Sequence, residues 1–181
     1  MRPILDFKNA LDREQVKVPA LRFGLEPELV AALIMQESGG KPDAWNPEPR
    51  YQWFWDVKAQ RPFRRVTQAE VASKFPPADF PCRAGDRDQE WWAQQASWGL
   101  LQLMGACARE AGCRLEYLTS LCDPAEGLEW GCRWLAKLVS RFAAGAVSAY
   151  NAGHPAPGSP YEVSVLQWRE KVRPLFSAPN Q

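Results

Sequence analysis

The 181-residue sequence contains a single histidine, His154, and this scarcity limits the chemistry open to it. Serine hydrolases need a histidine base, and His154 lies in the proline-flanked stretch AGHPAPG, where a structural or exposed histidine is more common than a catalytic one. The five cysteines form no CxxC pair, and the Cys/His spacing of a zinc site is missing. Phosphate-binding glycine loops and HExxH motifs are missing too. We therefore expect no cofactor and no metal, and carboxylate chemistry remains.

Long apolar runs and a strong net charge are also missing. No stretch approaches the roughly 20 apolar residues that span a bilayer, and the N-terminal stretch MRPILDFKNALDREQ lacks the apolar core of a signal peptide. The net charge of +1 gives none of the basic surface that nucleic-acid binders carry. The cysteines fit reduced, buried thiols, although one or two disulfides remain open. We expect no nucleic-acid partner, no stable membrane insertion and a monomer.

Apolar residues recur at helical spacing, which predicts a mainly α-helical fold without a large sheet. The chain is long enough to bury a core, so residues 1–181 are expected to form a single domain. Prolines, glycines and capping side chains mark the ends of the expected helices. These helices run from Pro27 to about Ser38, from Thr67 to before Pro76, from about Gln102 to Ala111, from Asp123 onward, and from Ser159 onward with Val165, Trp168 and Val172 on one side.

Glu37 ends the apolar face of the first expected helix, in the stretch AALIMQESGG. Val30, Leu33 and Ile34 take positions i, i+3 and i+4 of this face, and the acid takes position i+7. A carboxyl group among apolar neighbours is hard to ionise, so its pKa rises and it can stay protonated near neutral pH. Such a group can be the general acid that glycosidic cleavage requires. Spacing alone leaves open that Glu37 is a helix-edge residue paired with a basic side chain.

Four sequence blocks follow one another along the chain: ESGG (37–40), SWGLLQLM (97–104), Asp123-Pro124 with Gly131 and Leu135, and AYNAG (149–153). In this order they resemble the catalytic domain of soluble lytic transglycosylases, whose relatives include goose-type lysozymes and many phage enzymes that degrade cell walls. The resemblance covers residues 25–155, interrupted by an insertion at about 47–94, and implies a lysozyme-like helical fold. One departure is Gly105, where the family often has proline.

The resemblance also implies roles for residues in these blocks. Glu37 matches the single catalytic acid, which protonates the bond between N-acetylmuramic acid and N-acetylglucosamine in peptidoglycan and then acts as base on the sugar's C6 hydroxyl. The product is an anhydromuramoyl sugar. The matched substrate-binding positions are Ser97, Gln102, Met104, Tyr150 and Asn151. From residue type alone, Gln102 fits a surface helix, Met104 fits core filler and Tyr150 fits a helix-end aromatic equally well.

A hydrolytic mechanism is an alternative, because an ordinary glycosidase pairs its acid with a second carboxylate. Glu90 is the first choice for a second carboxylate across the cleft from Glu37, and a surface position is its plain alternative. With such a partner the protein would be a goose-type-like lysozyme. A glycan-binding virion component without turnover is a further alternative. The other acids near or within the insertion are Asp43, Asp56 and Asp88.

The insertion is rich in proline and contains the aromatic stretch YQWFW. Long loop-rich insertions often carry specificity, although they can also brace a fold. In the first role we expect Trp53 and Trp55 to stack on sugar rings, and arginines to bind peptide-stem carboxylates. The arginines in question are Arg61, Arg64 and Arg65.

Peptidoglycan glycan strands are the expected partner, so the protein would act on the bacterial cell wall, in the periplasm. A periplasmic enzyme needs export, and the sequence shows no signal peptide. This favours a phage-encoded endolysin that is made in the host cytoplasm, or an enzyme carried in the virion. A bacterial protein from which the signal peptide was removed is the competing interpretation.

Overall fold

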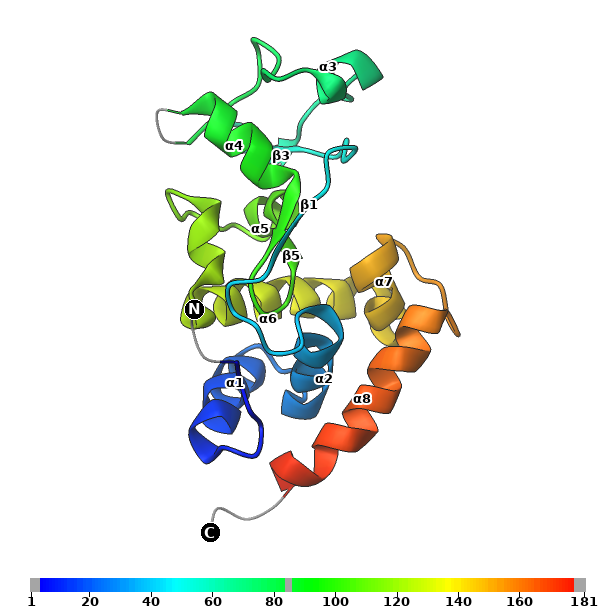
Figure 1. The fold of residues 1–181 in the computed structure, drawn as a ribbon. Coiled ribbons are helices and arrows are strands. Elements are labelled where there is room, and N and C mark those ends of the chain that lie inside the picture. Colours follow the sequence, from blue (N-terminus) through cyan, green and yellow to red (C-terminus); the bar gives the residue numbers. More distant parts are fainter. Residues whose placement is uncertain (1–3, 84–85, 178–181) are drawn as a thin grey trace.

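The structure, a computed structural model, describes residues 4–83 and 86–177 (Figure 1). It is mainly helical, as predicted, and short antiparallel strands form two small sheets, β1-β4-β5 and β2-β3. Among the described helices, none is both long and apolar enough to cross a membrane. The helices are α1 (Ala10–Arg22), α2 (Pro27–Glu37), α3 (Gln68–Ala72), α4 (Arg87–Gln94), α5 (Gly105–Glu110), α6 (Pro124–Phe142), α7 (Ala146–Ala152) and α8 (Pro160–Ser177), with 3-10 turns η1 (Leu118–Cys122) and η2 (Ala143–Gly145). The strands are β1 (Trp45–Pro47), β2 (Trp55–Asp56), β3 (Arg61–Pro62), β4 (Ala96–Trp98) and β5 (Leu103–Met104).

Helix α2 lies at the centre of the helical core. Its residues 30–34 are completely buried, and α2 packs most extensively against α8. Figure 1 shows α1 and α8 on either side of it. The predicted apolar face of α2 is therefore buried, which brings the acid at its end to the edge of the core. Two of the predicted cysteine thiols, Cys113 and Cys132, are also buried.

Capping residues set the helix boundaries where the sequence predicts them. The Asp123 carboxylate accepts a hydrogen bond from the Ala125 backbone N–H at 3.0 Å, and Pro124 occupies the first turn of α6. Thr67 and Glu70 form the predicted capping box at the start of α3. These two helix starts are confirmed.

The helix predicted over about 102–111 is shorter than expected and begins only at Gly105. Gln102 instead lies in the turn between β4 and β5, with a φ of 44°. The next two residues form β5, whose second residue pairs with Ser97 of β4. Helical spacing within one segment cannot reveal this pairing, because the partner strand comes from another part of the chain.

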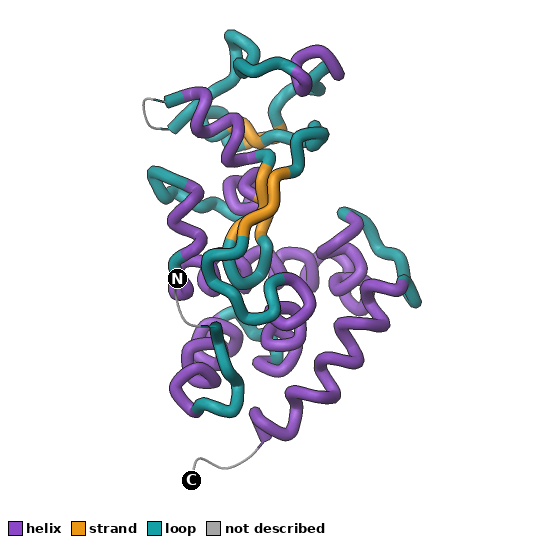
Figure 2. Tube along the Cα trace, viewed as in Figure 1, coloured by secondary structure: helices purple, strands orange, loops and turns teal. Residues whose placement is uncertain are grey.

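The insertion has a small aromatic core of its own. The Phe54 and Trp91 rings stack with their centroids 4.0 Å apart and their planes 7° from parallel, and the Phe80 ring meets Trp91 edge-on at 4.9 Å. Val66 and Val71 complete this cluster. The β2-β3 hairpin and the short helices α3 and α4 belong to the same part of the chain, and Figure 2 shows them as short strand and helix segments joined by loops. The insertion is thus a packed unit and not only a loop.

A buried ion pair joins this unit to the helical core. The Arg109 guanidinium of α5 donates to both oxygens of Glu90 in α4, at 2.9 and 2.7 Å, and neither side chain is more than 2% exposed. Arg109 also donates to the backbone carbonyls of Cys113 and Leu115, at 3.0 and 2.7 Å. Because every donor group in this network has an acceptor, the charge of Arg109 can be buried without a large penalty.

Gln94 extends the same network to the strands of the insertion. Its side-chain amide donates to Glu90 and to the Trp55 carbonyl, and its oxygen accepts from the Trp55 backbone N–H. Nearby, α4 and α5 approach so closely that a Cβ on Gly105 would lie 2.1 Å from the Ala93 carbonyl oxygen. No side chain fits against α4 at this position, so the proline that the resemblance implies would clash with the Ala93 carbonyl.

Replacing Glu90 with alanine leaves the Arg109 charge buried without its partner. We expect the free energy of unfolding to fall by about 3–5 kcal/mol, the usual cost of breaking a buried pair from one side. Urea denaturation followed by circular dichroism measures this loss. The matched control is Glu110→Ala, which removes the exposed pair with Lys137 and should cost no more than about 1 kcal/mol. Equal losses for the two variants would contradict the anchoring role of Glu90.

Candidate active site

Glu37 is the last residue of α2 and lies half-buried at the edge of the helical core. Burial raises the pKa of its carboxyl group, because the apolar surroundings disfavour the charged form. The next residue, Ser38, is buried, and its hydroxyl donates to the Leu100 carbonyl at 2.7 Å. The end of the helix is therefore fixed to the turn between β4 and β5.

Tyr161, in the first turn of α8, donates a hydrogen bond from its hydroxyl to the Glu37 carboxylate. Burial and the nearby Glu37 charge raise the pKa of Tyr161 well above its usual range, so the phenol stays protonated as a donor. One turn further along α8, the Ser164 hydroxyl donates to the Gln36 side-chain oxygen at 2.6 Å. Helix α8 thus holds both Glu37 and the residue before it.

Tyr161 was not among the predicted site residues, although the sequence contains a signal for it. Val165 and Val172 are buried and Trp168 packs beside them, which confirms the predicted stripe on the last helix. Tyr161 lies four residues before Val165 and extends this stripe by one turn toward the acid. A tyrosine at the end of an apolar stripe has a hydroxyl that needs a partner, and here Glu37 is that partner.

Tyr150, predicted for its place near the acid, is bonded to the sheet turn. Its hydroxyl donates to the Leu101 carbonyl at 2.8 Å from helix α7. Burial and the Glu37 charge both raise the pKa of Tyr150, which is consistent with a position close to the acid. The direct hydrogen bond to the carboxylate, however, comes from Tyr161.

The turn of residues 99–102 is built by a network of hydrogen bonds. Its first residue, Gly99, has a φ of 72°, and a Cβ there would lie 2.2 Å from the Leu121 carbonyl oxygen. The Gln102 amide donates to the carbonyls of Ala44 and Gly99, each at 3.0 Å, and its oxygen accepts from the Ser97 hydroxyl. Gln102 and Ser97 thus shape the turn that receives bonds from Ser38 and Tyr150.

Of the other predicted binding residues, Met104 belongs to this group and Asn151 does not. Met104 pairs with Ser97 across β5 and β4, and it is half-buried. Asn151 is exposed on the last turn of α7. The structure therefore gathers Glu37, Tyr161 and Tyr150 around the sheet turn.

Glu90 takes neither of the positions considered for it from the sequence. It is buried, so it does not lie on the solvated surface, and both its oxygens accept from Arg109, so it is not free to activate a water molecule. Asp56 accepts from the backbone N–H groups of the β2-β3 turn, and Asp43 is exposed. Glu90 therefore serves the packing of the insertion.

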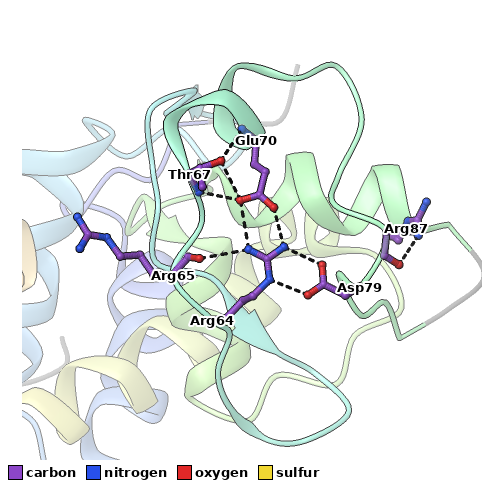
Figure 3. Close-up of polar contacts among 7 residues, drawn as sticks. Arg64, Arg65, Thr67, Glu70, Asp79 and Arg87 are labelled. Carbon is purple, nitrogen blue, oxygen red and sulfur yellow. Dashed lines mark hydrogen bonds and ion pairs between the residues drawn. The ribbon is translucent and has the colours of Figure 1, made fainter.

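Among the insertion residues predicted to contact substrate, Arg64 is held by acidic side chains of the insertion. Arg64 lies between Glu70 and Asp79 and pairs with both (Figure 3), with closest separations of 2.6 Å. These contacts lower the pKa of Glu70 to about 2. Arg65 contributes its carbonyl to the network, while its guanidinium points away (Figure 3). The backbone of Trp55 is bonded by Gln94, as described above, and Trp53 is 74% exposed, so the stacking of these indoles on sugar rings stays a prediction.

The helical core buries one acidic helix end beside a small sheet, and the turn of this sheet is bonded to that helix. A model of the Transglycosylase SLT domain family matches residues 14–159. The match covers most of the chain, which therefore belongs to the Transglycosylase SLT domain family.

Individual proteins show only a weak similarity to this chain. No curated protein matches the sequence. Among solved structures, the chain is similar to an inactive mutant of the lytic transglycosylase Slt from Pseudomonas aeruginosa, with 20% sequence identity and a TM-score of 0.48. The similarity covers 90% of this chain but only 22% of that one, so the chain spans less than a quarter of the length of the structure it matches.

The hydrogen bond from Tyr161 lowers the pKa of Glu37 and partly opposes the effect of burial. In Tyr161→Phe the charged carboxylate loses this donor, so we expect the pKa of Glu37 to rise further. A pH titration of the Glu37 carboxyl carbon by NMR measures the change. Tyr150→Phe is the matched control, because the Tyr150 hydroxyl donates to Leu101 and should leave the titration nearly unmoved. A fall in the pKa of Glu37 in Tyr161→Phe would refute the assignment.

Glu37→Gln should change how protein stability depends on pH. The folded-state pKa of Glu37 is raised, so the wild type loses stability as pH rises above the ordinary value of 4.5, where the unfolded chain ionises more readily. Below that pH Glu37 is protonated in both the folded and the unfolded chain, so the substitution does not raise the free energy of unfolding. We expect Glu37→Gln to have the higher free energy of unfolding at neutral pH and no advantage in acid. Urea denaturation at both pH values tests this, with exposed Asp43→Asn as control; equal behaviour of the two variants would count against a buried Glu37.

Proposed function

We propose that this domain is a peptidoglycan lytic transglycosylase. It cleaves the β-1,4 bond between N-acetylmuramic acid and N-acetylglucosamine in bacterial cell walls and forms an anhydromuramoyl product. The observation that carries the proposal is Glu37: one carboxyl group at a buried helix end, with a raised pKa, in a chain of the Transglycosylase SLT domain family. The family supports the reaction class, and the geometry supports the choice of acid.

In the first step Glu37 acts as general acid. Burial raises its pKa and so favours the protonated form, which can donate its proton to a glycosidic oxygen within reach. Transfer of this proton to the oxygen breaks the bond to C1, and N-acetylglucosamine leaves with the new hydroxyl. The positive charge that develops at C1 is stabilised by the substrate's own acetamido group, so no second carboxylate is required.

In the second step the Glu37 carboxylate acts as base. It removes the proton of the C6 hydroxyl of the same muramoyl residue, and the C6 oxygen forms a bond to C1. The carboxyl group regains its proton, and no water is consumed. Tyr161 supports both steps as a positioning residue, because its neutral phenol donates to the carboxylate and holds it at the end of α2.

The single-acid route is supported by the position of Glu90, the first candidate for a second carboxylate. Its two oxygens are engaged by Arg109, in the network that anchors the insertion. A water molecule activated by Glu90 would require breaking this pair. The anhydro-forming reaction avoids that requirement, since its nucleophile is part of the substrate.

Digestion of purified peptidoglycan tests the proposal. Wild type should release muropeptides one water lighter than hydrolysis products, as seen by mass spectrometry. Glu37→Gln should lower the rate of release by about 10²- to 10⁴-fold, the usual contribution of a general acid. Asp43→Asn, which changes an exposed acid on the following segment, should keep wild-type activity. Products that contain the added water would assign a lysozyme instead, and binding without release would assign a glycan-binding component.

A further inference from the structure

The β1-β4-β5 sheet has two faces, and only one of them contains the predicted binding residues. Asn46 of β1 pairs with Ser97 of β4, which pairs with Met104 of β5. Directly paired residues share a face of a sheet, and neighbours along a strand point to opposite faces. Trp45 and its partner Trp98 therefore project from the other face.

On this other face the sheet, α4 and the start of the insertion enclose a groove of about 380 Å³. Trp45 and Trp98 line it from the sheet, Trp92 lines it from α4, and Pro47 and Pro49 complete the largely apolar wall. Glu37 is not among the residues that line it. The groove is therefore separate from the acid site, and its volume lies in the range of about 300–1,000 Å³ typical of small-ligand sites.

The indole rings in the groove are held in place and yet open to solvent. Trp98 donates from its indole nitrogen to the Ala93 carbonyl at 2.9 Å, which fixes its ring. The Trp45 ring stacks on it with centroids 6.0 Å apart and planes 19° from parallel. Trp45 remains 59% exposed and Trp92 43% exposed. Two large aromatic surfaces are thus presented to whatever enters the groove.

A buried residue that lines the groove has an unused hydrogen-bond acceptor. Gln95 lines the groove and is 2% exposed. Its side-chain nitrogen donates to the Trp91 carbonyl, but its side-chain oxygen has no hydrogen-bond partner among the described residues. Buried polar atoms are normally paired. This oxygen can therefore accept a hydrogen bond from an N–H or O–H group of a ligand.

We propose that this groove is a second, non-catalytic binding site for N-acetylated sugar rings of a glycan strand. The apolar face of a pyranose ring would lie against the indoles of Trp45 and Trp92, and the acetamido N–H would donate to Gln95. The choice of sugar rests on the proposed function. A protein partner fits less well, because a stable interface needs about 800 Å² from each side.

Such a site would keep the domain on an insoluble wall between cleavage events. When one contact with a glycan network persists, rebinding at the other becomes intramolecular, and overall avidity rises without any new contact. The groove would therefore matter for insoluble cell walls and little for short soluble fragments, which can fill only one site at a time.

The binding test uses Glu37→Gln as background, so that no glycan is cleaved. The probe is the soluble β-1,4 tetramer of N-acetylglucosamine, followed by NMR through the indole N–H signals of the tryptophans. We expect the signals of Trp45 and Trp92 to shift, and Trp92→Ala to weaken binding at the groove about tenfold, which corresponds to about 1.4 kcal/mol. The matched control is Phe75→Ala, which removes an aromatic ring of the same insertion that is 67% exposed and lies outside the groove.

A parallel activity test keeps the groove separate from the acid site. Trp92→Ala with Glu37 intact should retain cleavage of short soluble glycans and lose about tenfold in activity on whole cell walls, while Phe75→Ala should retain both activities. Unmoved Trp45 and Trp92 signals, or equal binding by the Trp92 and Phe75 variants, would overturn the second site. Groove-dependent binding by a wild type that releases nothing would overturn only the proposed reaction, because binding is measured without cleavage.

Discussion

Burial of one carboxyl group at the end of α2 is the constraint on which the rest of the structure depends. A charge there is costly, so the surrounding elements must either keep Glu37 neutral or offer it a donor. Tyr161 supplies that donor from α8, which is also the helix that packs most extensively against α2. Ser38 and Tyr150 then bond the sheet turn to the same region. The site is stable because its polar groups satisfy one another at the edge of an apolar core.

The insertion meets a different constraint. It brings a buried carboxylate into the protein, and Arg109 of the helical core provides the matching charge. Its helix α4 lies so close to α5 that a Cβ has no room at Gly105. Its aromatic residues divide accordingly: Phe54 and Trp91 form a core, whereas Trp92 faces the groove beside the sheet. One segment therefore both packs against the fold and adds a surface to it.

Local features made much of the fold predictable. Apolar spacing and capping residues lie within a few positions of one another, so the positions of α2, α6 and α8 follow from the sequence. Helix α1 was not predicted, because charged residues and Pro19 interrupt its apolar spacing. Contacts between distant residues could not be predicted either: Glu37 and Tyr161 are 124 positions apart, and the partner of Glu90 is known only from the packing of α4 on α5. The monomeric state and the phage origin stay predictions.

The pairing of β1 with β4 has a further consequence for how this chain could have arisen. The backbone leaves the sheet at Pro47 and returns directly opposite it at Ala96, so everything between is a closed excursion from one pair of strands. In topology, a hairpin turn could replace it without moving any helix of the core. The ion pair of Arg109 makes the core depend on this segment, because the partner carboxylate, Glu90, lies within it. Loss of the excursion and replacement of Arg109 by an apolar residue would therefore have to occur together.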